Sequence, residues 1–482
     1  MKTVIYNIGT LAGILPADVR KLEGTQMNHV ECIDNAYLVI EDGIIAEFGK
    51  MSESVILNGT NGHVILKETK GHVILNETKD PVILNGTNGH VILNETKWSE
   101  ESSGERSFAD AQDDNKGRQD DNKGKEENRR QDDIIEYIDA KGGFVLPAFC
   151  DSHTHIVYAG CRDGEFRDKI AGLSYEEIAA RGGGILNSAD LLHETSEDEL
   201  YWQSMERVRE IMEMGTGAVE IKSGYGLTVE DELKMLRVIR RIKETAPITV
   251  KANFLGAHAV GRAYMGRQSE YVDLVCNEML PRVAEEGLAD YVDVFCDEGF
   301  FTVEETARIL AKAAEYGIQP KIHANELGVS GGVQVGVQYG ALSVDHLENT
   351  TEAEIEALRG SVTMPTMLPG CSFFLGLPYG NAKGYIEAGL PVALASDYNP
   401  GSSPSGNMRF VMALGCIKMR LTPEQSFNAC TINSAYAMGV SDTLGSITIG
   451  KKANLIITKP IPSLAFIPYS HQTPIIEKVI IG

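Results

Sequence analysis

The strongest constraint on the fold is a regular alternation of apolar and amphipathic segments through the middle of the chain. Eight apolar segments have the composition of buried strands, and most are separated by stretches with helical periodicity, such as 229–245 and 303–317. Eight strand–helix units in about 300 residues predict an α/β fold with a closed parallel barrel, the (β/α)8 TIM-type barrel. An open doubly wound sheet is less consistent with the sequence, because no Gly-rich phosphate loop follows the first strand. The eight segments are 144–155, 217–226, 249–259, 291–300, 320–328, 341–349, 361–368 and 391–401.

Both ends of the chain carry short strand patterns outside this alternation. Residues 36–50 have the pattern of two strands around an Asp-Gly turn, and further strand patterns follow residue 134 and residue 440. We therefore predict a small β-sandwich domain built from 1–50, 134–147 and 440–482, beside a barrel domain formed by 148–439.

Residues 51–133 differ in composition from both of these units. The tripeptide Val-Ile-Leu starts at residues 55, 64, 73, 82 and 91, and a polar tract with almost no aliphatic side chains follows. Such a tract cannot bury a core, so we expect partial disorder there. The repeats could stack as β-arches or form a loose hairpin array, and they could serve as an adhesive or partner-binding module. We favour a tolerated low-complexity insertion in a hairpin loop of the small β-domain.

The charge balance excludes several classes of function. The chain has 482 residues, with 44 basic and 68 acidic side chains and a formal net charge of −24. A surface this acidic repels phosphate backbones and anionic lipids, so we expect no nucleic-acid partner and no membrane partner. It also repels an anionic small substrate, unless an arginine in the pocket receives the negative group.

The sequence also bears on the compartment. No apolar run is long enough to cross a bilayer, and Asn7, Gly9 and Gly13 interrupt the apolar stretch at the N-terminus, which argues against a cleaved signal. The eight cysteines are scattered and include no Cys-x-x-Cys pair, which is typical of a reducing compartment. We therefore expect a cytoplasmic protein.

Histidines gather at the carboxyl ends of the predicted strands. His153 and His155 follow the first strand as an H-x-H pattern, His323 lies in the fifth strand, and Asp397 ends the eighth. The carboxyl ends of a parallel barrel meet at one rim, and alternate residues of a strand point the same way. An isolated H-x-H pair is more often a buried structural pair, but together these four side chains predict a shell for one divalent metal ion. Three imidazoles and a carboxylate suit Zn²⁺ or Fe²⁺, and they suit Mg²⁺ or Ca²⁺ poorly.

Two further side chains at this rim can move protons. Glu326 lies three residues after His323, where it can transfer a proton between water, substrate and a leaving nitrogen, or simply stabilise a helix N-terminus. His346 can polarise an oxygen or help to deprotonate a metal-activated water. A two-metal centre in such a barrel needs a bridging lysine at the end of the fourth strand. The sequence has Cys296-Asp297-Glu298 there, so we predict a single ion.

Seven motifs, taken in order, resemble the amidohydrolase superfamily and, within it, the imidazolonepropionase family. They are LPAFCDSHTHIVYAGCRDGEF, ARGGGI, EIKSGYGL, NFLGAHA, KIHANEL, SVDHLE and ASDYNPGS, and the resemblance covers the whole chain except 51–133. That family hydrolyses the ring C–N amide bond of 4-imidazolone-5-propanoate to N-formimidoyl-L-glutamate in histidine degradation. The resemblance implies a hydrolase with one Zn²⁺ or Fe²⁺, a small-molecule substrate with a carboxylate tail, and a homodimer.

The resemblance also implies roles for individual residues. The implied metal ligands are His153, His155, His323 and Asp397, and the implied catalytic residues are Glu326, His346 and Asp397. Arg162 would receive the propanoate carboxylate, since its planar fork suits that group. The implied substrate-binding residues are Arg162, Tyr225, His258, Glu326, Asn399, Gly401 and Ser402.

Each of these substrate-binding assignments has a plainer structural alternative. Arg162 could form a surface ion pair with Asp163 or Glu165, and Tyr225 could be a core aromatic. Residues 399–402 could form an ordinary Asn-Pro-Gly turn.

Two other functions compete with the implied one. A related cyclic amide or amidine hydrolase, or a nucleobase deaminase, would share the metal ligands, but a nucleobase offers no carboxylate to Arg162. A non-catalytic metal-binding or interaction protein would depend on 51–133 and would tolerate loss of Asp397.

Overall fold

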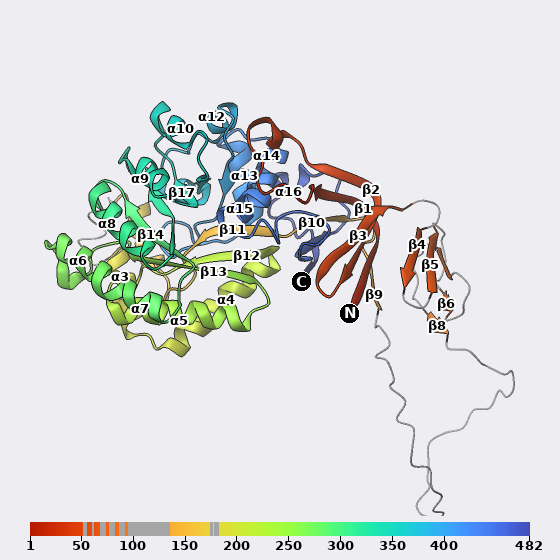
Figure 1. Cartoon of the computed structure of the whole chain (residues 1–482), viewed down its shortest axis with the longest axis horizontal. Helices are drawn as coiled ribbons and strands as arrows, with labels where there is room; N and C mark the ends of the chain where they lie inside the picture. Colours follow the sequence, from red (N-terminus) through yellow and green to blue (C-terminus); the bar gives the residue numbers. More distant parts are fainter. Residues whose placement is uncertain are drawn as a thin grey trace, which may run out of the picture.

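A computed structural model gives the architecture and confirms the predicted barrel (Figure 1). It describes residues 1–51, 135–173, 177 and 183–482, and between 52 and 134 it describes only the backbone of five short strands. Eight strands pair in parallel, each with the next along the chain except where the two-residue strand β15 (Gln319–Pro320) intervenes. In order they are β11 (Phe149–Thr154), β12 (Thr216–Lys222), β13 (Thr249–Ala257), β14 (Tyr291–Cys296), β16 (Ile322–Ala324), β17 (Ser343–His346), β18 (Met364–Met367) and β19 (Ala393–Leu394).

The first and last strands meet and close the barrel. A bridge joins Thr154 to Tyr398, just beyond β19, and the Asp397 backbone N–H donates to the carbonyl of His153 at 3.0 Å. The buried Asp151 carboxylate accepts hydrogen bonds from the backbone N–H and the hydroxyl of Ser396 across the same seam. Every residue of β11, β12 and β14 is buried, because helices cover the outside and side chains fill the inside.

Helices surround the barrel, and the sequence signals their limits. The predicted helix over 229–245 is α5 (Val229–Thr245), which begins after Thr228, whose hydroxyl accepts from Asp231 N. The helix predicted over 303–317 is α8 (Val303–Ala314), which begins with a capping box between Thr302 and Glu305. The other α-helices are α1 (Asp163–Ile170), α3 (Ile185–Glu194), α4 (Glu197–Glu213), α6 (Gln268–Leu274), α7 (Leu280–Glu285), α9 (Gly332–Gln338), α10 (Glu352–Leu358), α11 (Pro369–Leu375), α12 (Ala382–Glu387), α13 (Met408–Ile417), α14 (Pro423–Cys430), α15 (Ile432–Ala437) and α16 (Phe466–Tyr469). Short 3₁₀ turns span Gly24–Asn28 and Arg262–Tyr264, and one π-turn spans Val275–Met279.

The two chain ends build a second, seven-stranded sheet beside the barrel, next to both termini in Figure 1. The two edges of this sheet approach each other, as hydrogen bonds between the start of β3 and the segment just before β20 show: Ile45 N donates to Lys451 O, and Ala453 N donates to Gly43 O. The sheet therefore curls around its own apolar core, which includes Ile5, Leu38 and Val145. Its strands are β1 (Lys2–Ile14), β2 (Glu31–Glu41), β3 (Ile44–Lys50), β9 (Ile135–Asp139), β10 (Phe144–Pro147), β20 (Leu455–Thr458) and β21 (Ile476–Ile480).

The predicted Asp-Gly hairpin is present, but the predicted position of the insertion in a hairpin loop is wrong. β2 and β3 are antiparallel, and Asp42 and Gly43 between them both have positive φ, as a tight hairpin turn requires. The insertion joins β3 to β9, which are not paired with each other: β3 pairs with β2, and β9 runs parallel to β1. The insertion therefore connects strands on opposite sides of the β1–β2 pair.

Five short strands within 52–134 coincide with the five Val-Ile-Leu repeats. They are β4 (Val55–Gly59), β5 (Gly62–Lys67), β6 (Ile74–Asn76), β7 (Val82–Asn85) and β8 (Ile92–Asn94). β4 and β5 form an antiparallel pair, whereas β5 pairs in parallel with β7 and β6 in parallel with β8. Both of the predicted alternatives, a hairpin and a stack, thus occur among these strands. The polar tract for which partial disorder is predicted lies outside the described residues.

In the described part of the chain, no helix combines the length and the apolar character that a membrane crossing requires.

We expect that replacing residues 52–134 by a flexible linker leaves the fold intact. Lys50 at the end of β3 pairs with Ala36, which pairs with Ile8 of β1, whereas Ile135 at the start of β9 pairs with Lys2 of β1. The end of β3 and the start of β9 are thus separated by three strand spacings and by six residues along β1, which is roughly 25 Å. About twelve Gly/Ser residues span that distance comfortably. Thermal unfolding should stay cooperative, with a midpoint within about 3 °C of the parent.

A direct join of Met51 to Ile135 is the matched control for this deletion. It must pull β3 or β9 out of the sheet, so its unfolding midpoint should fall well below that of the linker variant. Loss of cooperative unfolding in the linker variant itself would contradict the expectation.

Candidate metal centre and active site

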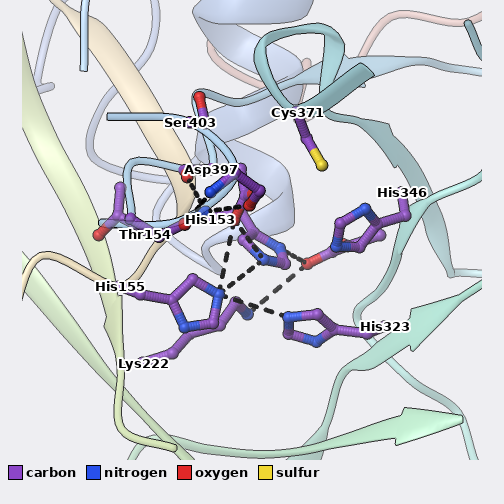
Figure 2. A network of polar contacts seen from close by, with 12 residues as sticks. His153, Thr154, His155, Lys222, His323, His346, Cys371, Asp397 and Ser403 are labelled. Carbon is purple, nitrogen blue, oxygen red and sulfur yellow. Dashed lines mark hydrogen bonds and ion pairs between the residues drawn. The ribbon is translucent and has the colours of Figure 1, made fainter. Parts of the chain in front are cut away.

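Four predicted ligands converge at the carboxyl rim of the barrel, as Figure 2 shows. The Nε2 atoms of His153 and His155 are 3.3 Å apart, and the Nε2 atom of His323 lies 3.5 Å from that of His155. Oδ1 of Asp397 lies 3.6 Å from Nε2 of both His153 and His155. All four side chains are buried. The structure thus brings together three imidazoles and one carboxylate from strands far apart in sequence.

Buried carboxylates set the orientation of two of these imidazoles. Nδ1 of His153 lies 2.7 Å from Oδ2 of Asp345 on β17, and Nδ1 of His323 lies 3.0 Å from Oδ1 of Asp293 on β14. A hydrogen on each Nδ1 leaves the Nε2 lone pair directed into the cluster. Burial, together with the charge of Lys222, lowers the pKa of His153 well below its usual value, so the ring is neutral.

A layer of buried charges supports these carboxylates from below. Lys222 Nζ lies 2.6 Å from Glu220 Oε1 and 2.8 Å from Asp293 Oδ2, and Lys321 Nζ contacts the other oxygen of Glu220. None of the four side chains is exposed. Burial alone would lower the pKa of Lys222, but Asp293 and Glu220 raise it above its usual value, so the amine stays charged. Lys222 is therefore an internal counterion of this layer.

The geometry of the cluster fits a divalent cation. Zinc bonds of about 2.0–2.3 Å place tetrahedral ligands roughly 3.3–3.7 Å apart, and the observed distances of 3.3, 3.5 and 3.6 Å lie in that interval. Three imidazole lone pairs and a carboxylate oxygen repel one another at such distances unless a cation lies among them. In addition, Nδ1 of His155 is buried without a hydrogen-bond partner. Residues His153, His155, His323 and Asp397 would hold the ion.

Glu326 and His346 lie beside the cluster, together with a further carboxylate, Glu348, that the sequence did not lead us to predict. Nε2 of His346 is 3.6 Å from Glu326 Oε2, and its Nδ1 is 3.5 Å from Glu348 Oε2. Burial lowers the pKa of His346, but the two carboxylates outweigh it and raise the value to about 10. Burial raises the pKa of Glu326, and it raises that of Asp397 to about 6. A cationic imidazole between two carboxylates can donate a hydrogen bond to a substrate oxygen.

Two buried carboxylates hold the loops that carry Glu326 and Tyr225. Asp297 accepts hydrogen bonds from the backbone N–H groups of residues 326, 327 and 328 at 2.7–3.2 Å. Glu232 on α5 accepts from those of residues 224, 226 and 227 at 2.7–3.1 Å. Each loop is thereby folded around a single side chain.

Several non-glycine residues at this rim have a left-handed backbone. They are Leu227 (φ 56°), Asn325 (φ 59°), His346 (φ 86°), Leu347 (φ 66°) and Asp397 (φ 54°). Such conformations are strained and gather at functional sites, where the surrounding structure enforces them.

The site opens into a cavity of about 390 Å³. Of the residues predicted for the site, only His153 is not part of the cavity wall, since it lies beneath the cluster. The predicted residues that line the cavity are His155, Arg162, Tyr225, His258, His323, Glu326, His346, Asp397, Asn399, Gly401 and Ser402. Aromatic side chains, including Phe166, Phe295 and Phe374, form the apolar part of the wall.

Arg162 lies in the cavity wall and also forms the ion pair considered as an alternative. Its Nε and Nη2 donate to Glu165 Oε2 at 2.8 and 2.5 Å, and Glu165 Oε1 accepts from Gly184 N and Asn187 Nδ2. Arg162 also packs against Gly401, where an added Cβ would lie 2.1 Å from Nη1. Glycine is therefore required at 401 for this packing. Nη1 does not bond Glu165.

The 399–402 turn is closed by its own side chains. Asn399 Oδ1 accepts from the backbone N–H groups of Gly401 and Ser402, and its Nδ2 donates to Asp397 O. Ser402 Oγ donates to Asp397 Oδ2 at 3.2 Å, which leaves Oδ1 for the cluster. The Asn-Pro-Gly turn is therefore real and also orients a predicted metal ligand.

His258 and Tyr225 pack beside the metal-ligand candidate His155. The His258 ring stacks on His155 with centroids 5.2 Å apart, and its Nδ1 lies 3.0 Å from Gly224 O. Burial, with the neighbouring His323, lowers the pKa of His258 to about 3, so the ring is neutral. The Tyr225 ring lies 5.5 Å from that of His258.

The charged layer of Glu220, Lys222, Asp293 and Lys321 was missed by the sequence analysis. A signal for it exists, because parallel barrel strands are normally continuous apolar runs. VEIK, VDVF and PKIH each interrupt such a run with a charged residue.

The comparisons with known proteins agree with this fold, and they show that the chain is a hydrolase of the amidohydrolase type. The Amidohydrolase family profile matches residues 144–482. The chain is 48% identical over 481 residues to an imidazolonepropionase of Flavobacterium johnsoniae, covering 100% of this chain and 99% of that protein. It is 58% identical over 345 residues to one of Christiangramia forsetii, covering 72% and 84%. The chain belongs to the imidazolonepropionase family of amidohydrolases.

Solved structures with little sequence similarity share the fold. A guanine deaminase of E. coli superposes with a TM-score of 0.64 at 13% identity, covering 100% of this chain and 97% of that chain. An adenosine deaminase of Xanthomonas campestris, solved with bound zinc, superposes with a TM-score of 0.60 at 13% identity, covering 99% and 91%.

We expect Asp293→Asn to weaken divalent-ion binding by about 10–100-fold, because His323 loses the carboxylate that orients it. Competition with a chromophoric chelator measures the affinity. Asp290→Asn is the matched control, since Asp290 precedes the same strand but pairs with Lys251 at a partly exposed position. Equal affinities in the two variants would refute the orienting role of Asp293.

Proposed function

We propose that this enzyme hydrolyses the ring C–N amide bond of 4-imidazolone-5-propanoate to N-formimidoyl-L-glutamate, a step of histidine degradation. The observation that carries the proposal is the shared cavity: the histidine–aspartate cluster and the Arg162 guanidinium line the same wall. A cation-binding cluster and a carboxylate receptor together suit a small ring with an acidic tail. Family membership at 48% identity over the whole chain supports the same reaction.

Arg162, Tyr225 and His258 bind and orient the substrate in this proposal. Nη1 of Arg162, which does not bond Glu165, packs against Gly401 and places a cationic donor where the propanoate tail can reach it. Neutral His258 and Tyr225 line the same cavity and hold the flat ring by stacking and hydrogen bonds. Asn399, Gly401 and Ser402 complete the pocket with a rigid turn. Glu326 contacts the ring from the side of His346.

The hydrolytic step needs an activated water and a proton for the leaving nitrogen. A divalent ion held by the cluster lowers the pKa of water at the site and so supplies a nucleophile near neutral pH. Cationic His346 donates a hydrogen bond to the ring oxygen and stabilises the negative charge that develops when water attacks the carbonyl carbon. Glu326 or Asp397, whose pKa values burial raises, takes the proton from water and delivers it to the departing nitrogen.

We propose Zn²⁺ or Fe²⁺ as the resident ion, because the three-imidazole, one-carboxylate donor set suits both. Metal analysis of the protein as purified distinguishes them. We also propose a cytoplasmic homodimer. The reducing location is supported by eight free cysteines, and sedimentation of the full chain tests the dimer.

The direct test is incubation of metal-loaded protein with 4-imidazolone-5-propanoate, followed through the loss of ring absorbance and by mass of the product. We expect one N-formimidoyl-L-glutamate per ring consumed, without ammonia. Release of ammonia from a nucleobase, with no turnover of the imidazolone, would replace the proposal with a deaminase.

We expect Arg162→Ala to raise KM by about 10–100-fold with a smaller change in kcat, because a charge-assisted contact of about 1.5–3 kcal/mol to a part of the substrate remote from the reacting bond is lost. Arg167→Ala, on the exposed side of α1, is the control and should match the parent. An unchanged KM in Arg162→Ala would show that the tail is bound elsewhere.

A further inference from the structure

A second group of ligand-type side chains lies directly beside the catalytic cluster. Cys371, on α11, places its Sγ 3.7 Å from Glu326 Oε1, and Glu326 Oε2 lies 3.6 Å from His346 Nε2. One ligand atom from each of the three residues lies within 4.8 Å of the other two. In Figure 2 the sulfur of Cys371 points down from the top of the view, toward the space between Asp397 and His346.

We propose that Glu326, His346 and Cys371 form a second binding site, for one thiophilic divalent cation such as Zn²⁺ or Cd²⁺, and that filling it inhibits the enzyme. A thiol, an imidazole and a carboxylate are the ligand types that zinc prefers. Sγ of Cys371 and Nε2 of His346 approach different oxygens of Glu326, at 3.7 and 3.6 Å, and these spacings are close to the roughly 3.3–3.7 Å between tetrahedral ligands. Binding displaces the thiol proton of Cys371 and the Nε2 proton of cationic His346, and both protons leave to solvent.

The local charge can accommodate two cations. Asp397, Glu326 and Glu348 supply three negative charges, and the deprotonated Cys371 supplies a fourth, which together balance two divalent ions. Two-metal sites in other hydrolases hold their ions about 3.5–4 Å apart under similar compensation. His346 is available as a ligand through Nε2, the nitrogen that faces Glu326, because its 3.6 Å contact with that carboxylate is an ion pair and not a hydrogen bond.

The second ion can reach the site and would block proton transfer there. Glu326 and His346 line the open cavity, so a cation enters by the substrate's own route. Once bound, it occupies the two groups that the proposed reaction uses for proton transfer and oxyanion stabilisation. The inhibitory consequence therefore rests on the proposed function, whereas the binding site itself does not.

Cadmium titration of the holoenzyme tests the site, with the charge-transfer absorption of cadmium thiolate as the readout. The parent for this experiment carries Cys32→Ser and Cys161→Ser, which remove the two exposed thiols. It should bind one cadmium equivalent beyond the resident ion with the signal of one thiolate. Adding Cys371→Ser should abolish that signal, whereas adding Cys430→Ser, at a buried thiol elsewhere, should leave it intact. Cys371→Ala provides a second reading if the serine variant folds poorly.

Activity forms the second arm of the test. Excess Zn²⁺ should inhibit the parent, and Cys371→Ser should raise the inhibitory zinc concentration at least about tenfold when each variant is compared with its own activity without excess ion. Absence of the extra cadmium equivalent, or a thiolate signal that persists in Cys371→Ser, would overturn the proposal. If the imidazolone is not turned over at all, the cadmium signal still decides the site, so the two failures are distinguishable.

Discussion

Two hydrogen bonds between buried groups, His153 to Asp345 and His323 to Asp293, set the orientation on which the rest of the centre depends. They fix which nitrogen of each ring faces the cluster. The charged layer of Glu220, Lys222, Asp293 and Lys321 below them is costly, because apolar side chains of similar size would pack there without loss of hydration. Its role is therefore to hold the two carboxylates in place beside the imidazoles. The buried charges in this part of the barrel core therefore serve the geometry of the candidate metal centre more than the stability of the fold.

The same device, a buried carboxylate that organises its surroundings, recurs in the loops. Asp297 folds the loop that carries Glu326, Glu232 folds the loop that carries Tyr225, and Ser402 fixes one oxygen of Asp397. Glu165 does the same for Arg162 and for the backbone at Gly184. Several residues that contact substrate in the proposed reaction are thus held in place by a neighbouring side chain.

The fold and the centre of the site were predictable because their signals are local and repeated. Apolar strands alternate with amphipathic helices, and ligand residues such as His153 and Asp397 lie at strand ends, where the topology of a parallel barrel brings them together. The residues that were missed act at a distance in sequence. Asp293 matters because it hydrogen-bonds His323 from the neighbouring strand β14, and Cys371 because α11 carries it to Glu326. The position of the insertion was predicted wrongly because strand order, unlike strand identity, depends on long-range pairing of β9 with β1.

The left-handed backbone at His346 and Asp397 has a consequence for how the enzyme acquires its ion. These conformations are disfavoured for an isolated chain, so the packing of the folded barrel must impose them. The protein therefore offers a preformed binding site and does not need to fold around the metal ion. Exchange of one ion for another then requires no unfolding, and the occupant reflects which cations the cell supplies as much as any preference of the ligands.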